Sequence, residues 1–218
     1  MPRPIFIALL LCVYALPSPA SAQSLDNLNA DDPYVQPQSA PSLSPEIASY
    51  TRTSTPSPEN TATITQFGIG NANQIQQVGA LNVGNSFALG AGNAANSTQV
   101  GIGNLSSNSI AGFDNRSTLF QYGTFNRAGL ATSGSSNSNS HVQFGNQLAG
   151  SSVIAGSQSS GIGVIQLGNR QSSSVAIVGG KNTKVSSFVI GTGTAGPVVI
   201  YGGHNRQVIV IQKLPKKK

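Results

Sequence analysis

Alternation between two kinds of position is the dominant pattern along the chain from residue 61 onward. In residues 71–77 every second residue is an amide or an aliphatic side chain, namely Asn71, Asn73, Ile75 and Gln77, and residues 115–121 alternate in a similar way. A period of two residues is typical of β-strands, in which successive side chains point to opposite faces. The pattern therefore predicts a series of strands of about five or six residues each.

Glycine separates these strands at regular intervals. All 25 glycines lie at or after position 68, and nine follow a step of eleven residues from 68 to 156. After a twelve-residue step the series resumes at 168 and 179, and after another at 191 and 202. Eleven residues accommodate one strand and one tight arch, but not the crossover helix of a parallel βαβ unit. Residues 61–212 are therefore predicted to be all-β, a β-solenoid of about 14 short strands in about 7 two-strand rungs stacked in parallel.

Amide side chains flank the glycines, with asparagine often three residues after and glutamine often two residues before. If these positions face the interior, each buried amide without a partner costs about 1 to 3 kcal/mol. In-register stacking removes that cost, because each amide can donate to its copy in one neighbouring rung and accept from its copy in the other. The positions expected to form this stacking ladder are Gln66, Gly68, Asn71, Gln77, Gly79, Asn82, Gln99, Gly101, Asn104, Gln121, Gly123, Asn126, Gln143, Gly145, Gln166 and Gly168.

The opposite assignment of the two faces remains open from the sequence. It buries Phe67, Val78, Val100, Tyr122 and Phe144 and exposes the amides. Large side chains of this kind also suit an ordinary hydrophobic core.

Four positions depart from the asparagine pattern. Leu148, Ser159, Gln171 and Thr194 stand where the repeat calls for asparagine, and both twelve-residue steps fall in the same part of the chain. We therefore expect irregular ladders between about residues 145 and 197.

The N-terminal segment is predicted to be a secretory signal peptide, residues 1–22. Arg3 precedes an apolar run, which is followed by prolines and by a small-residue cleavage site at Ala20 and Ala22. About a dozen apolar residues are too few to span a bilayer, which needs roughly 20. The only cysteine, Cys12, lies in this segment, so the secreted form is expected to contain no thiol.

Residues 23–60 differ in composition from the repeats. They are rich in proline and serine, and their charges are five acidic residues against Arg52 alone, whereas residues 61–218 hold ten basic residues and only Asp114 as an acid. Such a segment buries too little apolar surface to offset the entropy of ordering it. A disordered acidic leader is predicted here, either an address for a secretion apparatus or a plain spacer.

Both ends of the predicted solenoid are rich in β-forming residues, and neither has an evident polar cap. The first strand starts with TATITQF and the last, residues 207–212, reads QVIVIQ. Uncapped edges of this kind favour pairing with another copy of the same chain. The basic tail, residues 213–218, contains Lys213, Lys216, Lys217 and Lys218. It could restrain stacking, bind an anionic surface or polysaccharide, or simply be a solvated terminus.

Candidate catalytic and metal-binding groups are scarce. His141 and His204 lie in different repeats without a carboxylate cluster, so they are interpreted as arch or surface residues. We expect no enzymatic activity, no metal and no cofactor. The basic residues of the repeats are spread over many rungs, which argues against specific nucleic-acid recognition.

The repeat resembles that of curlins, the subunits of extracellular amyloid fibres called curli in Gram-negative bacteria. The motif QxGxxN is complete at residues 66–71, 77–82, 99–104 and 121–126, and partial copies extend to residue 207. The resemblance covers about 150 of the 218 residues.

The resemblance implies a secreted, self-polymerising subunit that passes through a dedicated outer-membrane exporter and supports adhesion and biofilm formation. Glycine in every half-rung and the basic C-terminus look more like the minor, nucleating subunit than the major one. Its partners would be other copies of itself and other curlin subunits. The alternative is a non-polymerising secreted β-solenoid adhesin or ligand-binding protein.

Overall fold

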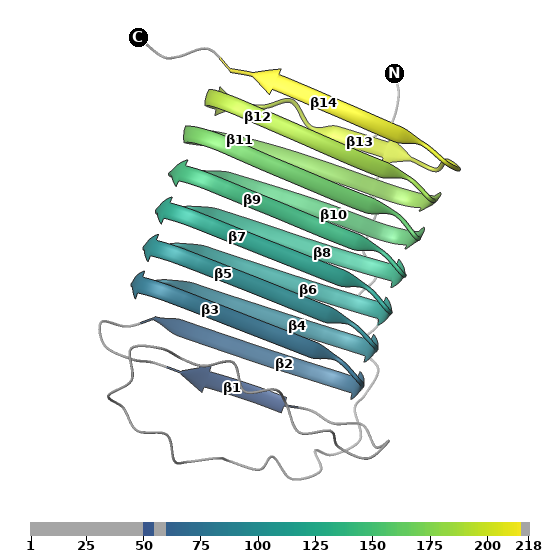
Figure 1. Ribbon diagram of the computed structural model, residues 1–218, viewed down its shortest axis with the longest axis horizontal. Helices are drawn as coiled ribbons and strands as arrows, with labels where there is room; N and C mark the ends of the chain where they lie inside the picture. Colours follow the sequence, from purple (N-terminus) through teal and green to yellow (C-terminus); the bar gives the residue numbers. More distant parts are fainter. Residues whose placement is uncertain (1–49, 55–59, 215–218) are drawn as a thin grey trace, which may run out of the picture.

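The computed structural model describes residues 50–54 and 60–214, and these residues form strands joined by tight arches, with no helix (Figure 1). The predicted signal peptide with Ala20 and Ala22, most of the predicted leader, and Lys216, Lys217 and Lys218 lie outside the described residues.

The strands stack in two facing layers, and every pairing between rungs is parallel. One layer contains β2 (Thr61–Ile69), β4 (Val83–Ala91), β6 (Leu105–Phe113), β8 (Arg127–Ser135), β10 (Ala149–Gln158) and β13 (Val198–Tyr201). The other contains β3 (Ala72–Ala80), β5 (Ala94–Ile102), β7 (Arg116–Thr124), β9 (Ser138–Asn146), β12 (Lys184–Thr194) and β14 (Gln207–Lys213).

The long strand β11 (Gly161–Lys181) contributes to both layers. Its first part pairs with β9 and β12, and its second part pairs with β10 and β13. Counting β11 as two segments, β2 to β14 supply fourteen strands in seven rungs. The predicted all-β solenoid of about 14 strands and about 7 rungs is therefore confirmed.

The number of residues per rung changes from 22 to 23 along the stack, and a second, local register shift follows between Gly168 and Gln171. Paired residues are 22 positions apart from Thr61 with Val83 to Thr132 with Ile154, whereas Ser138 pairs with Gly161, 23 positions later. The extra residue enters between Ile154 and Ser157, where the register shifts. Gly134 is consequently opposite Ser157 and not opposite Gly156. The regular glycine series therefore fails to predict the column of Gly134, although Gly145, Gly168 and Gly191 still stack in the other layer.

The arch glycines of the earlier rungs are required by a close approach between rungs. At Gly123 the φ angle is +125°, and a Cβ atom would overlap the carbonyl oxygen of Gly145 in the next rung. Both features exclude a side chain, because L-residues rarely adopt this backbone conformation and the neighbouring carbonyl belongs to the backbone of a paired strand.

The alternate strand positions that carry the amides face the interior, as the favoured interpretation of the sequence predicted. Gln99, Gln121 and Asn104 are fully buried, whereas Val78 and Tyr122 are 54% and 55% exposed. The opposite assignment of faces is therefore wrong. We call β2 to β9 the polar rungs, because amides and serines dominate their interior.

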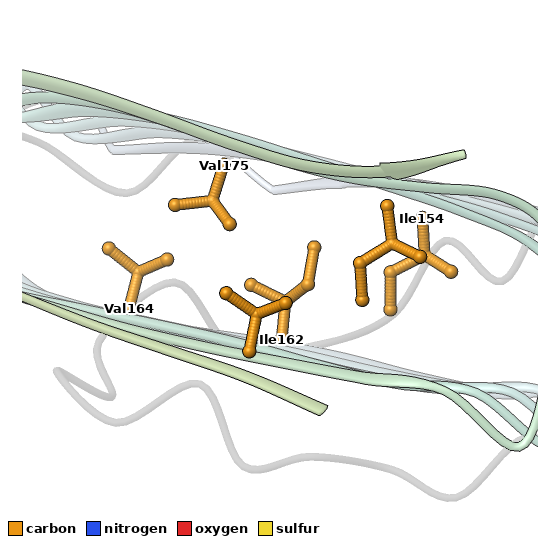
Figure 2. Close-up of a cluster of buried hydrophobic side chains, with 6 residues drawn as sticks. Ile154, Ile162, Val164 and Val175 are labelled. Carbon is orange, nitrogen blue, oxygen red and sulfur yellow. The ribbon is translucent and has the colours of Figure 1, made fainter. Parts of the chain in front are cut away.

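The last three rungs, from β10 to β14, have a different interior and are called the aliphatic rungs. Their core is one cluster of buried side chains: Ile154, Ile162, Val164, Val175, Ile177 and Val185. Figure 2 shows Val175 extending from one layer toward Val164 and Ile162 of the other. Hydrophobic burial, rather than amide pairing, holds these layers together.

A short strand lies inside the segment that was predicted to be a disordered leader. β1 (Tyr50–Ser54) pairs antiparallel with β2, placing Tyr50 opposite Gln66 and Ser54 opposite Ala62. This corrects the expectation of a first rung without any cap, because one of its two edges is covered. The physical reason is that β2 offers a free row of hydrogen-bonding groups to any nearby extended segment.

Candidate assembly surfaces

A ladder of glutamines runs through the interior of one layer. Gln77 Nε2 donates to Gln99 Oε1 at 2.8 Å, Gln99 to Gln121 at 2.9 Å, Gln121 to Gln143 at 2.9 Å and Gln143 to Gln166 at 2.7 Å. Each Nε2 also donates to a backbone carbonyl, as Gln121 does to that of Leu105. All bonds of the ladder point the same way, so it has a donor end and an acceptor end.

Gln166 ends the continuous glutamine ladder beside a buried histidine. His141 Nε2 lies 2.9 Å from Gln166 Oε1, and His141 Nδ1 lies 3.0 Å from Ser152 Oγ. Because Gln166 Oε1 can only accept, Nε2 carries the proton and Nδ1 accepts from the serine hydroxyl. Gly150 provides the space, since a Cβ atom there would overlap the imidazole.

Burial lowers the pKa of His141 to about 4, although the hydrogen bond to Gln166 opposes this shift. The ring is therefore neutral at neutral pH. This position corrects the interpretation of both histidines as arch or surface residues: His141 is fully buried, and only His204 is exposed. The sequence did indicate this burial, because His141 lies two residues before Gln143 and therefore on the same inward face of the strand.

Asparagines form a second set of ladders at the arches. Asn104 is representative: its Nδ2 donates to the carbonyl of Gly123 at 3.0 Å and to Asn82 Oδ1 at 3.1 Å. Its own Oδ1 accepts the backbone N–H of Asn126 at 3.0 Å. Each asparagine thus joins neighbouring rungs through side chain and backbone, which goes beyond a local turn role. Asn93, Asn115 and Asn137 make equivalent contacts on the other side of the solenoid.

The departures from asparagine have different consequences. Leu148 N still donates to Asn126 Oδ1, but leucine has no amide with which to continue the ladder. Gln171 restores only the donor contacts: its Nε2 donates to the carbonyls of Leu167 and Gly191, whereas its Oε1 is buried without a hydrogen-bond partner. In the other arch Ser160, rather than Ser159, takes the inward position and donates its N–H to Asn137 Oδ1.

Most of the predicted ladder amides are brought together in two columns, but Gln66 and Asn71 lie outside them. Gln77, Gln99, Gln121, Gln143 and Gln166 share one column, and Asn82, Asn104 and Asn126 share another. Gln66 does not join them, because it belongs to the opposite layer, where Ala88 is its neighbour in β4. Asn71 belongs to the second set of arches and bonds to Asn93.

The two ends of the stack present unequal edges. Within the described residues, β13 pairs only with β11 and β14 only with β12, so both strands have a free edge at the C-terminal end. At the N-terminal end β3 pairs only with β5, whereas β2 is covered by β1. Val198, Ile200 and Val208 are only partly buried at the C-terminal end.

One outer face carries apolar side chains in two neighbouring rows, which we call the apolar rows. The first is Val78, Val100, Tyr122, Phe144, Leu167 and Ile190, and the second is Phe120, Val142, Ile165, Phe188 and Ile211. The ring of Phe144 lies 5.4 Å from that of Phe120 and 6.2 Å from that of Tyr122. On the opposite face the corresponding column starts with Phe67 and Leu89 and continues with the small residues Ala111 and Ser133.

Basic residues gather at arches near the C-terminal end. Lys181 is paired with His204, and Lys184 N donates to the carbonyl of Arg206. The described residues contain no group of three or more His, Cys, Asp or Glu side chains that could hold a metal ion. They also contain no helix with the length and hydrophobicity needed to cross a bilayer.

The fold and the ladders define this protein as a parallel β-solenoid with stacked buried amides. Comparisons of the chain with protein-family models, with curated proteins and with solved structures find no match.

Proposed function

We propose that this chain is a secreted structural subunit of curli-like extracellular amyloid fibres. Copies stack in register along the solenoid axis, and the fibre supports adhesion and biofilm formation at the cell surface. The curlin-like repeat and the predicted signal peptide favour export through the periplasm and a curli-type outer-membrane apparatus. Neither catalysis nor a cofactor belongs to this role.

The observation that carries the proposal is the directional glutamine ladder. Each rung completes its hydrogen bonds only with the next rung, as Gln99 does between Gln77 and Gln121. The strand edges at the C-terminal end also offer unpaired backbone groups in the described residues. Parallel, in-register strands with exposed edges are the arrangement from which cross-β fibres grow.

Fibre formation by the form that starts at Gln23 tests the proposal. We expect fibres whose diffraction has a reflection near 4.8 Å along the fibre axis, the spacing between paired strands. Protein that stays monomeric at high concentration, while its circular dichroism shows folded β-structure, would contradict the proposal.

The position of the subunit within the fibre is tested by cross-seeding. If this chain is a nucleating subunit, a trace of preformed protein should shorten the lag phase of a major curlin subunit. If it is instead a major subunit, its fibres should elongate efficiently with its own monomer but should have little effect on the lag phase of the other curlin subunit. Lys213 and the lysines of the basic tail would then contact an anionic surface or polysaccharide, and high salt should weaken that attachment.

A second candidate is a non-polymerising β-solenoid adhesin or ligand-binding protein. The apolar rows favour it, because contiguous exposed apolar surface marks interaction sites. Replacing Tyr122 and Phe144 by serine separates the two functions: an adhesin loses surface binding, whereas fibre growth at the strand edges continues.

A further inference from the structure

The strand β1 occupies backbone groups that another copy would need for stacking. β2 has two edges: β4 pairs with one of them, and β1 pairs with the other along residues 62–66. A backbone edge can form only one ladder of hydrogen bonds at a time. No further strand can therefore join β2 at this end while β1 stays in place.

The columns of the solenoid identify the strand that would replace β1. The inward column of Val198 continues through successive rungs to Ile64, by way of Val175, Ser152, Leu130, Asn108 and Ser86. If a second copy continues the stack, its β13 lies against β2, with Val198 over Ile64 and Ile200 over Gln66. β1 places Arg52 and Tyr50 opposite these same two residues.

The other layer has no such obstacle in the described residues. There β14 of the second copy would lie against β3, and the glutamine column would place Gln212 over Gln77. Gln212 Nε2 donates to the carbonyl of Gly196, 16 residues earlier, as Gln77 Nε2 does to the carbonyl of Thr61. Its remaining N–H is suited to donate to Gln77 Oε1 of the next copy, which continues the direction of the ladder.

We propose that β1 and the β13 strand of a second copy compete for the same edge of β2, so that β1 controls when the N-terminal end accepts another copy. This inference rests on the proposed self-assembly. Docking begins between β14 and the open edge of β3, and it is completed when β13 displaces β1. The C-terminal end has no covering strand among the described residues, and each junction joins it to the N-terminal end of the neighbouring copy, so every added copy requires one β1 to be displaced.

β1 is suited to a temporary role by its direction and its length. It runs antiparallel to β2 in a stack that is otherwise parallel, so it cannot continue the columns of like residues. It also covers only five of the nine residues of β2. The incoming strand replaces these backbone bonds and, in addition, buries Val198 and Ile200, which are only partly buried in the single molecule.

A reversible cross-link tests the competition. Thr53 and Thr63 are directly opposite in the β1–β2 pair, and opposed residues of antiparallel strands have Cα separations compatible with a disulfide. The double variant Thr53→Cys/Thr63→Cys, made in the form starting at Gln23, would lock β1 onto β2 when oxidised. The control disulfide Asn85→Cys/Ser107→Cys joins paired strands inside the stack and leaves both ends free.

Elongation from preformed wild-type fibres is measured for oxidised and reduced protein. The locked variant should elongate about tenfold more slowly or worse, the factor that corresponds to 1.4 kcal/mol, and reduction should restore the rate. The control disulfide should have no such effect. Equal elongation of the oxidised and reduced Thr53→Cys/Thr63→Cys protein overturns the inference.

A second variant acts in the opposite direction. Arg52→Pro/Thr53→Pro removes two consecutive backbone donors, so at least one lies on the side of β1 that faces β2. The variant should shorten the lag phase while circular dichroism of the monomer stays unchanged. A longer lag contradicts the inference, because β1 would then assist assembly. If wild-type protein forms no fibres at all, the proposed function fails first and this inference fails with it.

Discussion

The polar rungs and the aliphatic rungs have the same backbone architecture but different sources of stability. In the polar rungs, buried Gln121 and Asn104 are satisfied by equivalent amides in the next rungs. In the aliphatic rungs, Ile154, Val175 and Ile177 fill the same inward positions with hydrocarbon. The backbone hydrogen bonds between parallel strands are shared by both regions, so the interior chemistry is free to vary.

The difference shows that the polar rungs depend on exact register, whereas the aliphatic rungs tolerate a change of register. A shift of one residue would separate every amide from its partner and leave buried polar groups unpaired. Hydrophobic contact is not directional, so the packing of the aliphatic side chains survives an extra residue per rung, although Ser173 Oγ and Ser187 Oγ are buried there without a partner. The step from 22 to 23 residues indeed falls where the interior becomes aliphatic.

The largest expected effect is at the arch glycines. Gly123→Ala should lower the free energy of unfolding by about 5 kcal/mol, because the new Cβ overlaps the carbonyl of Gly145 and the backbone is strained. Gly179, in an arch of the aliphatic rungs, has φ +58° and open space around its Cβ position. Gly179→Ala should cost only about 1 kcal/mol. Urea unfolding of freshly refolded monomer measures both values, and equal losses would refute the distinction.

A matched pair of isoleucines tests the two interiors directly. Ile177 and Ile110 are both fully buried and occupy the same inward column. Ile177→Ala leaves a cavity in the aliphatic cluster and should cost about 4 kcal/mol. Ile110→Ala should cost about 2 kcal/mol, because its column already contains Ala88 in the preceding rung. A larger loss at Ile110 in thermal or urea unfolding would contradict this comparison.

Acid should weaken the boundary between the two regions through His141. Its pKa is lowered to about 4, below the ordinary 6.5, so the unfolded chain binds the proton more readily than the folded one. The contribution of neutral His141 to the free energy of unfolding is therefore complete above pH 6.5. It is lost as the pH falls toward 4, by about 3 kcal/mol in total. Urea unfolding between pH 7 and 4.5 measures this loss.

His141→Gln should remove most of this pH dependence, whereas His204→Gln, at the exposed histidine, should retain it. An unchanged pH profile in the His141 variant would show that other groups cause the loss.

The smallest effects are expected within the glutamine column. Gln121→Leu leaves one donor of Gln99 and the acceptor of Gln143 without partners, and should cost about 2 kcal/mol. Val189 stands between Gln166 and Gln212 in the same column. Val189→Gln should cost less than about 1 kcal/mol, because the new amide has an amide neighbour on each side. A greater loss at Val189 than at Gln121 in urea unfolding would refute the ladder as a source of stability.

The sequence by itself predicted the series of strands and the rung of two repeats, and it favoured the inward orientation of the amides, although the strands are nine residues long rather than five or six. These features depend on local properties: the two-residue period of a strand, the need for glycine in a tight arch, and the cost of burying an amide without a partner. Gln99, Gln121 and Gln143 recur at a constant spacing of 22 residues, so their pairing follows from the repeat alone.

The tertiary structure alone decided which residues become neighbours where the repeat is interrupted. The location of the extra residue, between Ile154 and Ser157, and the local shift between Gly168 and Gln171 set the later columns. The burial of His141 depends on Gly150 in the facing layer, and the cover on β2 comes from a strand outside the repeats. These contacts join segments whose pairing no constant spacing specifies, so they depend on how the two layers pack and on which strand edges remain free.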